Sequence, residues 1–507
     1  MAKKKKKERN RGPVSTLLIL TIMIGAFSFL FSFLGWESYQ TSIANGTLES
    51  SLITVNNFFS FDGIRFFFNN AVNNFQVFEP LVLLIIVLIG IGICERSGFV
   101  EAILAPFKKI RFEILLFFTL FLGIISTVIG DYSYILLIPL TGVIYKSLGK
   151  NPTVGILTCF LGITIGYGTG IIYNYNDYLL GGFTQASATL DVDKTYQFTL
   201  DSSILIMIVS TFVLAFVGTI LVNRLLVPKY PKRYSITEEE VRISKKAKNI
   251  TLIALLVALG VLVYFLIPST APGAGILLDQ TETSYIAKVF GSQSPFQNGF
   301  VLIVTMIMML AGFLYGKLSG NIKNSNEFSL GLSKNFENLG FMFVLMFFTS
   351  QMLAILNWTN LGTVVGARIV DFLSHVQFSG ILLIVTFFLA VILMGILLPG
   401  TFEKWNLLYP TIIPLFMRAN IAPEFTLFIF KIADGIGKAL TPMFLYFMIT
   451  LAFLEKYRTS DKVQVGVFQT WKSILACVLS MGFVLLLVIV LWYLMGLPIG
   501  MGIFPTL

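Results

Sequence analysis

The sequence predicts an all-α polytopic membrane protein with about nine transmembrane helices, two re-entrant hairpins and an inverted repeat. Its composition, its apolar runs and its distribution of positive charge lead to this prediction. The 507 residues are 56% hydrophobic and 12% charged, whereas a soluble globular chain is about 25% charged. The apolar residues fall in runs of about 18–22, the length that crosses a hydrocarbon core of about 30 Å.

The chain begins with a basic segment, residues 1–13, that holds seven Lys and Arg. The apolar run at 14–35 is too long for the core of a signal peptide and lacks a small-residue cleavage site, so we predict a retained transmembrane helix. The basic segment is expected to lie in the cytoplasm beside anionic lipid headgroups and not to bind nucleic acid.

Two apolar pairs do not fit simple spans, because a short glycine-containing break divides each pair. Gly130-Asp131-Tyr132 divides the segment 112–148, and Pro399 to Glu403 divides the segment 380–418. We predict that each segment is a re-entrant hairpin. Full spans are predicted near residues 14–35, 79–97, 153–176, 203–226, 249–268, 297–317, 338–357, 424–453 and 473–495.

The distribution of Lys and Arg favours the hairpins. With two hairpins and a cytoplasmic N-terminus, 28 of the 36 Lys and Arg fall in cytoplasmic segments and five fall outside. Such a bias is the rule for multi-pass proteins. If the first hairpin were a full span, the basic loop 227–248 would lie outside. We therefore predict a multi-pass protein of the plasma membrane with a cytoplasmic N-terminus.

The two halves of the chain are related at an offset of 271 residues. Matching residues are Leu136-Leu137-Ile138-Pro139 with Leu407-Leu408-Tyr409-Pro410, Pro152 with Pro423, and Gly166 with Gly437. The span 79–97 would run inward and its counterpart 338–357 outward. Residues 79–226 and 338–495 are therefore predicted to be inverted repeats, joined by the cytoplasmic loop and the transmembrane helices of 249–317. Transporters built this way bind substrate near mid-membrane, where broken elements meet.

Charged residues at membrane depth are costly and usually face a cavity or a partner. Asp131 and Ser133 lie at the first break, where a helix start directs unpaired N–H groups and a positive dipole end towards a site. Asp131 could instead only cap the helix that begins at Tyr132.

Glu403, Lys404 and Trp405 lie at the second break, shortly after Thr401. Lys404 is a candidate to meet a substrate carboxylate, with Trp405 stacking on an aromatic ring. An ion pair between Lys404 and Glu403 would instead be structural.

Three charges follow within eight residues of the span 424–453: Lys431, Asp434 and Lys438. Their i,i+3 and i,i+4 spacings place them on one helix face, which predicts an ion-pair ladder. Gly435 and Pro442 indicate a broken helix that lines a cavity, because irregular backbone at membrane depth is tolerated only there.

The counterpart in the first half is the glycine-rich segment Gly162 to Gly170, followed by Asn174, Asn176 and Asp177. The glycines also suit close helix packing, and Asp177 could be an ordinary loop carboxylate. The three cysteines and the single histidine, His375, show no spacing of a metal site, disulfide framework or catalytic triad. We expect no enzymatic activity.

These motifs resemble those of the AbgT family of p-aminobenzoyl-glutamate transporters, in order from about residue 79 to 455. The motifs that match are Gly130-Asp131-Tyr132-Ser133-Tyr134, Leu137-Ile138-Pro139-Leu140, Gly166-Tyr167-Gly168, Asp177 to Thr184, Lys404-Trp405, Ile432-Ala433-Asp434 and Thr441-Pro442. The resemblance implies nine transmembrane helices, two hairpins, a homodimer, and transport of p-aminobenzoyl-glutamate, with efflux of sulfonamides in some members.

The family's functional positions match Asp177, Trp405, Pro423, Asp434 and Pro442. Two regions depart from the family pattern. The second break lacks the usual Ser-Ala-Ser-Ala run before its Lys-Trp, and Lys431 and Gly435 stand where the family usually has Arg and Ser. These departures bear on the substrate and leave the predicted fold unchanged.

We therefore predict a secondary active transporter of an organic anion that works by alternating access and is coupled to Na⁺ or H⁺. The predicted substrate-binding residues are Ser133, Thr401, Lys404, Trp405, Pro423, Lys431 and Pro442. The predicted residues for the coupling ion are Asp131, Asn174, Asp177 and Asp434. No cofactor is expected, and the partners are membrane lipid and the small organic anion.

Three alternatives stay open. A sodium-coupled dicarboxylate or amino-acid carrier on the same architecture is the nearest one, because the second break departs from the family pattern. A channel belongs to another class and would not accumulate solute. A membrane-embedded transferase would need a nucleophile–base pair or a metal cluster, and the sequence offers neither.

Overall fold

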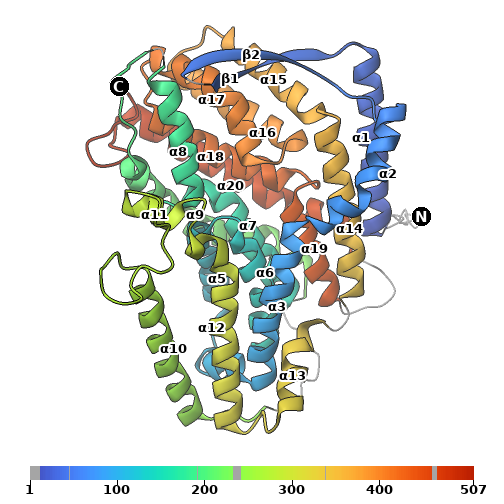
Figure 1. Cartoon of the computed structure of the whole chain (residues 1–507), viewed down its shortest axis with the longest axis vertical. Coiled ribbons are helices and arrows are strands. Elements are labelled where there is room, and N and C mark those ends of the chain that lie inside the picture. Colours follow the sequence, from blue (N-terminus) through green and yellow to red (C-terminus); the bar gives the residue numbers. More distant parts are fainter. Residues whose placement is uncertain (1–11, 45, 191, 232–240, 337–338, 459–464) are drawn as a thin grey trace, which may run out of the picture.

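Helices make up nearly all of the regular structure (Figure 1). The computed structural model describes residues 12–44, 46–190, 192–231, 241–336, 339–458 and 465–507. Most of the basic N-terminal segment and part of the predicted loop 227–248 lie outside these residues.

The first half contains α1 (Pro13–Phe33), β1 (Glu37–Ala44), β2 (Thr47–Thr54), α2 (Phe61–Gln76), α3 (Glu79–Ser97), α4 (Phe99–Leu104), η1 (Ala105–Phe107), α5 (Phe112–Ser126), η2 (Thr127–Ile129), α6 (Tyr132–Ser147), α7 (Pro152–Ile165), η3 (Gly166–Gly168), α8 (Tyr175–Ala188), η4 (Leu200–Ser203), α9 (Ile204–Leu225) and η5 (Val227–Lys229). The rest contains α10 (Lys245–Phe265), α11 (Tyr285–Phe290), α12 (Pro295–Ser319), α13 (Ser325–Ser333), η6 (Lys334–Phe336), α14 (Gly340–Trp358), α15 (Leu361–Ser374), α16 (Gly380–Leu397), α17 (Thr401–Arg418), α18 (Pro423–Leu440), α19 (Leu445–Lys456) and α20 (Val467–Met495).

The predicted all-α fold with about nine helices of membrane-spanning length is confirmed. Within the described residues, nine helices are long and apolar enough to cross a membrane, or ten when the bent pair α18 and α19 is counted as one span. Seven of the nine, α1, α3, α9, α10, α12, α14 and α20, overlap predicted spans. The pair α18 and α19 overlaps the predicted span 424–453 and bends by 45° at its break.

Two details differ from the predicted spans. The predicted span 153–176 is shorter, because α7 ends at Ile165 and η3 follows over Gly166–Gly168. Glycine destabilises a helix interior, and Gly170 adopts φ +140°, a conformation that other residues rarely adopt. The other two apolar helices of span length are α5 and α16, the first arms of the predicted hairpins. Helix length does not separate a hairpin arm from a crossing helix, so the hairpins and the inverted repeat stay predictions.

In the predicted repeat, α5, α6 and α7 would correspond to α16, α17 and α18. Pro152 and Pro423 each begin the third helix of their set. In the first set, a Cβ on Gly162 would lie 2.7 Å from the Leu120 carbonyl oxygen. In the second, a Cβ on Gly395 would lie 2.9 Å from Cα of Gly437. Glycine therefore lets both pairs of helices cross in backbone contact.

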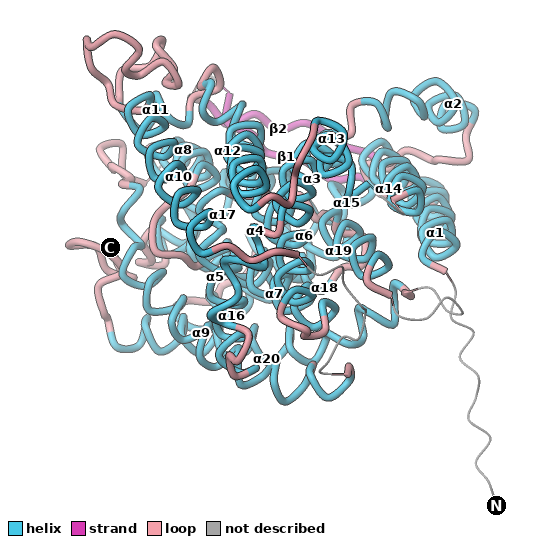
Figure 2. Tube along the Cα trace, turned by 90° about the horizontal axis from the view of Figure 1, so that it is seen from below, coloured by secondary structure: helices cyan, strands magenta, loops and turns pink. Residues whose placement is uncertain are grey.

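Burial places α18 at the centre of the molecule. Every residue from Pro423 to Ala439 is buried, although the helix carries four charged residues. By contrast, α10 buries only Ala247 and Thr251. Seen from below, α1, α2 and α10 lie at the rim (Figure 2). An apolar helix at the rim suits contact with lipid, whereas a charged helix needs protein around it.

The segment before α3 forms a structure that the sequence only partly predicted. Its aromatic stretch, Phe58 to Phe68, is typical of an interfacial helix, and α2 begins within it with Ser60 as its N-cap. The antiparallel hairpin of β1 and β2, which pairs Glu37 with Thr54, was not predicted. β1 packs against α15 and α17, so the β1–β2 hairpin covers part of the C-terminal half of the chain (Figure 1).

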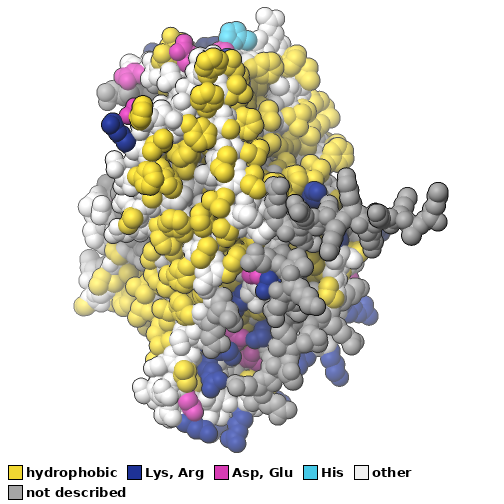
Figure 3. Space-filling model, turned by 90° about the vertical axis from the view of Figure 1, so that its right-hand side faces the viewer, with side chains coloured by type: hydrophobic (Ala, Val, Ile, Leu, Met, Phe, Trp, Pro, Cys, Tyr) yellow, Lys and Arg dark blue, Asp and Glu magenta, His cyan; other side chains and the backbone are white. Residues whose placement is uncertain are grey.

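The charged side chains are unevenly placed on the surface. Figure 3 shows hydrophobic side chains over a broad band of one face, with Lys and Arg gathered beneath it. This end of the molecule carries α13 (Figure 1). An excess of positive charge at one end is what the predicted topology requires.

Candidate functional site

Asp434 of α18 is the centre of a buried charge cluster. Its Oδ1 lies 2.5 Å from Nζ of Lys404, and its Oδ2 lies 3.1 Å from Nζ of Lys438. Thr401 Oγ1 donates to Asp434 Oδ2 at 2.7 Å. Lys404 and Asp434 are 0% exposed and Lys438 is 3% exposed. One carboxylate thus holds two ammonium groups away from water and lipid.

Local structure explains why these groups meet. Lys438 follows Asp434 by one turn of α18, the i,i+4 spacing that sets side chains side by side. Thr401 and Lys404 belong to the first turn of α17, which starts at the second break after the N-cap Gly400. The second break therefore places the Thr401 hydroxyl and the Lys404 ammonium group beside the Asp434 carboxylate of α18.

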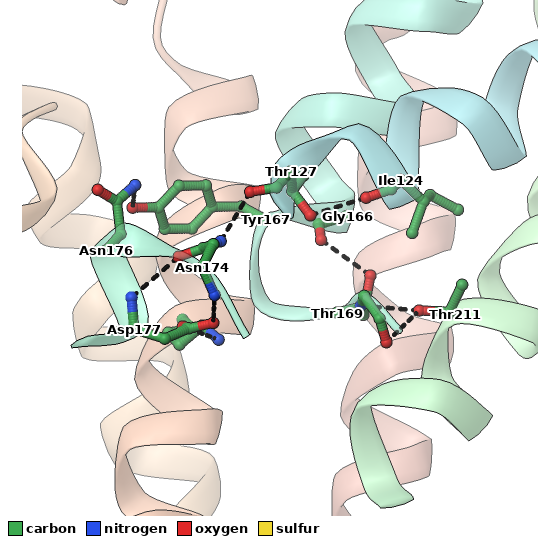
Figure 4. Close-up of polar contacts among 11 residues, drawn as sticks. Ile124, Thr127, Gly166, Tyr167, Thr169, Asn174, Asn176, Asp177 and Thr211 are labelled. Atoms are coloured by element: carbon green, nitrogen blue, oxygen red, sulfur yellow. Dashed lines mark hydrogen bonds and ion pairs between the residues drawn. The ribbon is translucent and has the colours of Figure 1, made fainter. Parts of the chain in front are cut away.

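A second buried ion pair joins the halves of the chain. Nζ of Lys431 forms an ion pair with Oδ1 of Asp177, the third residue of α8. Asp177 Oδ2 also accepts a hydrogen bond from the Asn174 backbone N–H at 3.0 Å, while Asn174 Oδ1 accepts from the Asp177 N–H at 2.9 Å. This reciprocal capping box (Figure 4) fixes the Asp177 carboxylate at the start of α8.

Asn174 also ties α8 to the first break, because its Nδ2 donates to the Thr127 carbonyl at 2.7 Å. Beside it, Asn176 Nδ2 donates to the Tyr167 hydroxyl at 2.9 Å (Figure 4). Tyr167 belongs to η3, and its ring lies 3.7 Å from Nζ of Lys438. The side chain of Tyr167 thus links the start of α8 to α18.

Glycines bring the η3 segment against α18. A Cβ on Gly168 would lie 2.6 Å from the Ile432 backbone nitrogen, and a Cβ on Gly435 would lie 2.4 Å from the Thr164 carbonyl oxygen. Side chains at either position would separate the two backbones. The close packing of η3 on α18 therefore requires glycine at these positions. This packing holds α18 near the start of α8, where Lys431 forms its ion pair with Asp177.

A cavity of about 310 Å³ lies between the two breaks. Asp131 comes from the first break, Thr401 and Glu403 come from the second, and Lys438 comes from α18. The remaining residues of its wall are Tyr167, Leu353, Asn357, Leu398, Pro399, Gly400, Phe402, Phe444, Leu445 and Tyr446. The structure thus brings both breaks to one cavity, as expected for a site at their meeting point.

Several predicted site residues lie elsewhere. Ser133 is fully buried, and its hydroxyl lies 2.6 Å from the carbonyl oxygens of both Ser126 and Gly130, which act as its acceptors. Trp405 is 0% exposed and packs on Phe430 at 4.5 Å between ring centroids. These two residues are not on the cavity wall in this conformation.

The two predicted prolines also lie off the wall. Pro423 begins α18, eleven positions before Asp434. Pro442 lies in the break between α18 and α19, next to Thr441, whose hydroxyl donates to the Ile396 carbonyl at 3.0 Å. Both prolines shape the ends of α18, where a missing N–H is tolerated.

Three structural interpretations from the sequence are wrong. Asp131 does not cap α6 with its side chain, and its Oδ1 has no hydrogen-bond partner within the described residues. Of the ion-pair ladder only the Asp434–Lys438 pair is present, because Lys431 forms its ion pair with Asp177 and not with Asp434. Lys404 forms its pair with Asp434 and not with Glu403. For the two lysines, a tertiary contact replaces a sequence neighbour.

The sequence did not single out the aromatic wall. Tyr167, Phe444 and Tyr446 lie on the cavity, and Tyr446 stacks on the buried Tyr134 at 4.3 Å between centroids. The sequence feature that could have pointed to these three residues is their place beside an interruption of a predicted helix. In the described part of the chain, no group of three or more His, Cys, Asp or Glu is placed to hold a metal ion.

The chain is similar in sequence to known transport proteins. Residues 8–507 match the model of the "AbgT putative transporter family". The p-aminobenzoyl-glutamate transport protein of Escherichia coli (strain K12) is 24% identical over 476 residues, which cover 93% of this chain and 91% of that protein.

Two solved structures are also similar. The YdaH transporter of Alcanivorax borkumensis, whose topology is described as unusual, is 24% identical, with a TM-score of 0.49 over 97% of this chain and 100% of that chain. MtrF of Neisseria gonorrhoeae, described as one of a class of antimetabolite efflux pumps, is 25% identical, with a TM-score of 0.48 over 96% of both chains.

Proposed function

Because this chain belongs to the AbgT transporter family, we propose that it is a secondary active transporter of a small organic carboxylate, either p-aminobenzoyl-glutamate or a related aryl or dipeptide carboxylate. The observation that carries the proposal is the cavity between the two breaks, which lies beside the buried cluster around Asp434. Buried charges at membrane depth mark transport pathways.

The ion pairs suggest how binding is coupled to transport. Lys404 and Lys438 share the carboxylate of Asp434, and Lys431 is held by Asp177. A substrate carboxylate could take over one ammonium group only if the released Asp gained another positive charge. Na⁺ or H⁺ supplies that charge. Substrate and coupling ion would thus bind together, which is the requirement for coupled transport.

The proposed setting is the plasma membrane, with the N-terminus in the cytoplasm and the chain as a homodimer. The gathering of Lys and Arg at one end supports the orientation. The homodimer follows from the family resemblance. The direction of transport depends on the gradients and the coupling, so the same site would serve uptake or the efflux of sulfonamides.

The first test is uptake of labelled p-aminobenzoyl-glutamate into proteoliposomes with imposed Na⁺ or proton gradients. We expect saturable accumulation by the wild type and its loss in Asp434→Ala. The matched control is Asp62→Asn on the exposed surface of α2, whose side chain is 85% exposed. Its uptake should equal that of the wild type.

Folded wild-type protein that moves no carboxylate under any gradient contradicts the proposal. Saturable accumulation driven by an ion gradient would exclude a channel, whereas flux that only equalises concentrations contradicts coupled transport.

A further inference from the structure

A groove of about 390 Å³ lies between α15 and α16, and it shares no residue with the cavity between the breaks. The two helices pack together close to the β1–β2 hairpin (Figure 1). Each helix lines the groove with residues at i, i+3, i+4 and i+7, which lie on one helix face. These residues run from Val365 to Phe372 on α15 and from Thr386 to Leu393 on α16, and Trp36 completes the wall.

The groove opens to the outside of the molecule. Phe372, Leu389 and Leu393 are 61%, 55% and 57% exposed, although all three are large and apolar. α16 is also long and apolar enough to cross a membrane, and its opposite side packs on α18. An exposed apolar surface on such a helix faces the hydrocarbon of the bilayer. We therefore expect the occupant of the groove to be a molecule of the membrane.

Trp36 indicates how deep in the membrane the groove lies. It follows the 21-residue helix α1, and a helix of this length extends about 32 Å, close to the thickness of the hydrocarbon core. Trp side chains gather where such a helix reaches the lipid headgroups. The guanidinium carbon of Arg368 lies 4.8 Å from the Trp36 ring centroid. Arg368 is therefore expected at the depth of the headgroups.

Arg368 is the one charged residue of the groove wall, and within the described residues the Trp36 ring is its only partner. The single carboxylate of α15, Asp371, lies 3.7 Å from His375 instead. The positive-inside rule does not explain Arg368, because α15 lies at the end of the molecule opposite the gathered Lys and Arg (Figures 1 and 3). A guanidinium without a carboxylate suits a phosphate group, which can accept two of its N–H bonds.

We propose that this groove binds an anionic phospholipid, whose phosphate pairs with Arg368 and whose acyl chain lies along Leu389 and Leu393. The unneutralised guanidinium favours a headgroup of net negative charge over a zwitterionic one, because it repels the positive group of the latter. The indole N–H of Trp36 has no acceptor among the described residues, so it can donate to the same headgroup. The bound lipid packs on the outer side of α16, the helix that leads to the second break.

The test compares dioleoylphosphatidylglycerol with dioleoylphosphatidylcholine, which share their acyl chains and differ in net charge. The full chain is equilibrated with both lipids in nanodiscs, and the lipids that stay bound after its release are counted by native mass spectrometry. The basic end of the molecule also attracts anionic lipid, so the readout is the difference between variants. We expect Arg368→Gln to weaken one phosphatidylglycerol site at least about fivefold, the scale for one Arg near the membrane surface. Arg368→Lys keeps the charge and should keep the lipid. The matched control is Arg65→Gln on α2, whose side chain is 76% exposed.

A second variant tests the apolar part of the site. Ala390→Phe fills the groove with a ring and leaves Arg368 unchanged, so it should lose the same phosphatidylglycerol. Equal retention by the wild type and Arg368→Gln overturns the inference, as does full retention by Ala390→Phe. A lower oligomer mass of either variant shows that a second copy of the chain covers the groove, which also overturns it. Thermal unfolding confirms that the variants are folded. Transport is not measured, so the proposed function stands or falls separately.

Discussion

At the scale of single residues, the buried carboxylates of Asp177 and Asp434 already have protein partners in the absence of a ligand. Asp177 is held by a capping box and an ion pair at once, and Asp434 receives two ammonium groups and a hydroxyl. Burial makes each pair strongly interdependent, because removal of one partner leaves the other charged and unsolvated.

This interdependence can be measured at the pair of Lys431 and Asp177. We expect Asp177→Asn and Lys431→Met each to destabilise the protein by about 3 kcal/mol or more, because each leaves one buried charge unpaired. The double variant should recover at least about 1 kcal/mol of the summed loss, as interacting neighbours do. Reversible unfolding in detergent and a double-mutant cycle provide the measurement. Additive losses would show that the pair does not interact.

The sequence predicted which charged residues lie in the candidate site, but it did not predict most of the residues that they contact. Charges at membrane depth identified Asp131, Lys404, Lys431, Asp434 and Lys438 without a structure. The partners differed because sequence spacing reports only contacts within one helix, such as Lys438 with Asp434. The pairs of Lys431 and of Lys404 cross between helices. No local pattern fixes such contacts.

At the scale of elements, the site is assembled by helix ends and glycines. The second break at the start of α17, the start of α8 and the end of α7 contact α18, and the first break faces α18 across the cavity. Gly168 packs a 3₁₀ turn onto the α18 backbone at Ile432. The sequence predicted the breaks and the glycine-rich segment. The β1–β2 hairpin was missed because its strands are mostly polar and exposed, so they lack an alternating apolar pattern.

The glycine contact gives a test at this scale. Gly168→Ala places a Cβ 2.6 Å from backbone, so we expect a loss of about 1–3 kcal/mol of stability, the usual cost of overpacking. Transport should also fall. The matched control is Gly182→Ala on α8, where nothing lies within 4 Å of the added Cβ. Thermal unfolding and uptake are measured for both. Equal behaviour of the two variants would show that the contact is not required.

At the scale of the whole molecule, the question is which helices cross the membrane. The predicted hairpins place residues 109 and 150 on one side and residues 377 and 420 on the other. The alternative, in which residues 112–148 and residues 380–418 each cross the membrane once, separates the members of each pair. Positive charge gathers at one end (Figure 3), which favours the hairpins under the positive-inside rule.

Cysteine labelling decides between these topologies. Cys94, Cys159 and Cys477 are buried and free, so new cysteines can be read against a low background. We expect an impermeant thiol reagent added to intact cells to label Gln377→Cys and Asn420→Cys but not Lys109→Cys or Lys150→Cys. Labelling of all four after permeabilisation is the control. Labelling of Lys150→Cys from outside, with Lys109→Cys protected, contradicts the hairpin.

The burial of α18 has a consequence for how the chain is made. A Lys or Asp at the centre of a helix costs about 2.5–3.5 kcal/mol when the translocon releases that helix into lipid. α18 carries Lys431, Asp434 and Lys438, and it is not among the helices that qualify as a span by themselves. Its partners Asp177 and Lys404 precede it in the chain. During synthesis α18 is therefore expected to leave the translocon only onto a surface already built from α7, α8 and α17, so biogenesis of the second half is templated by the first.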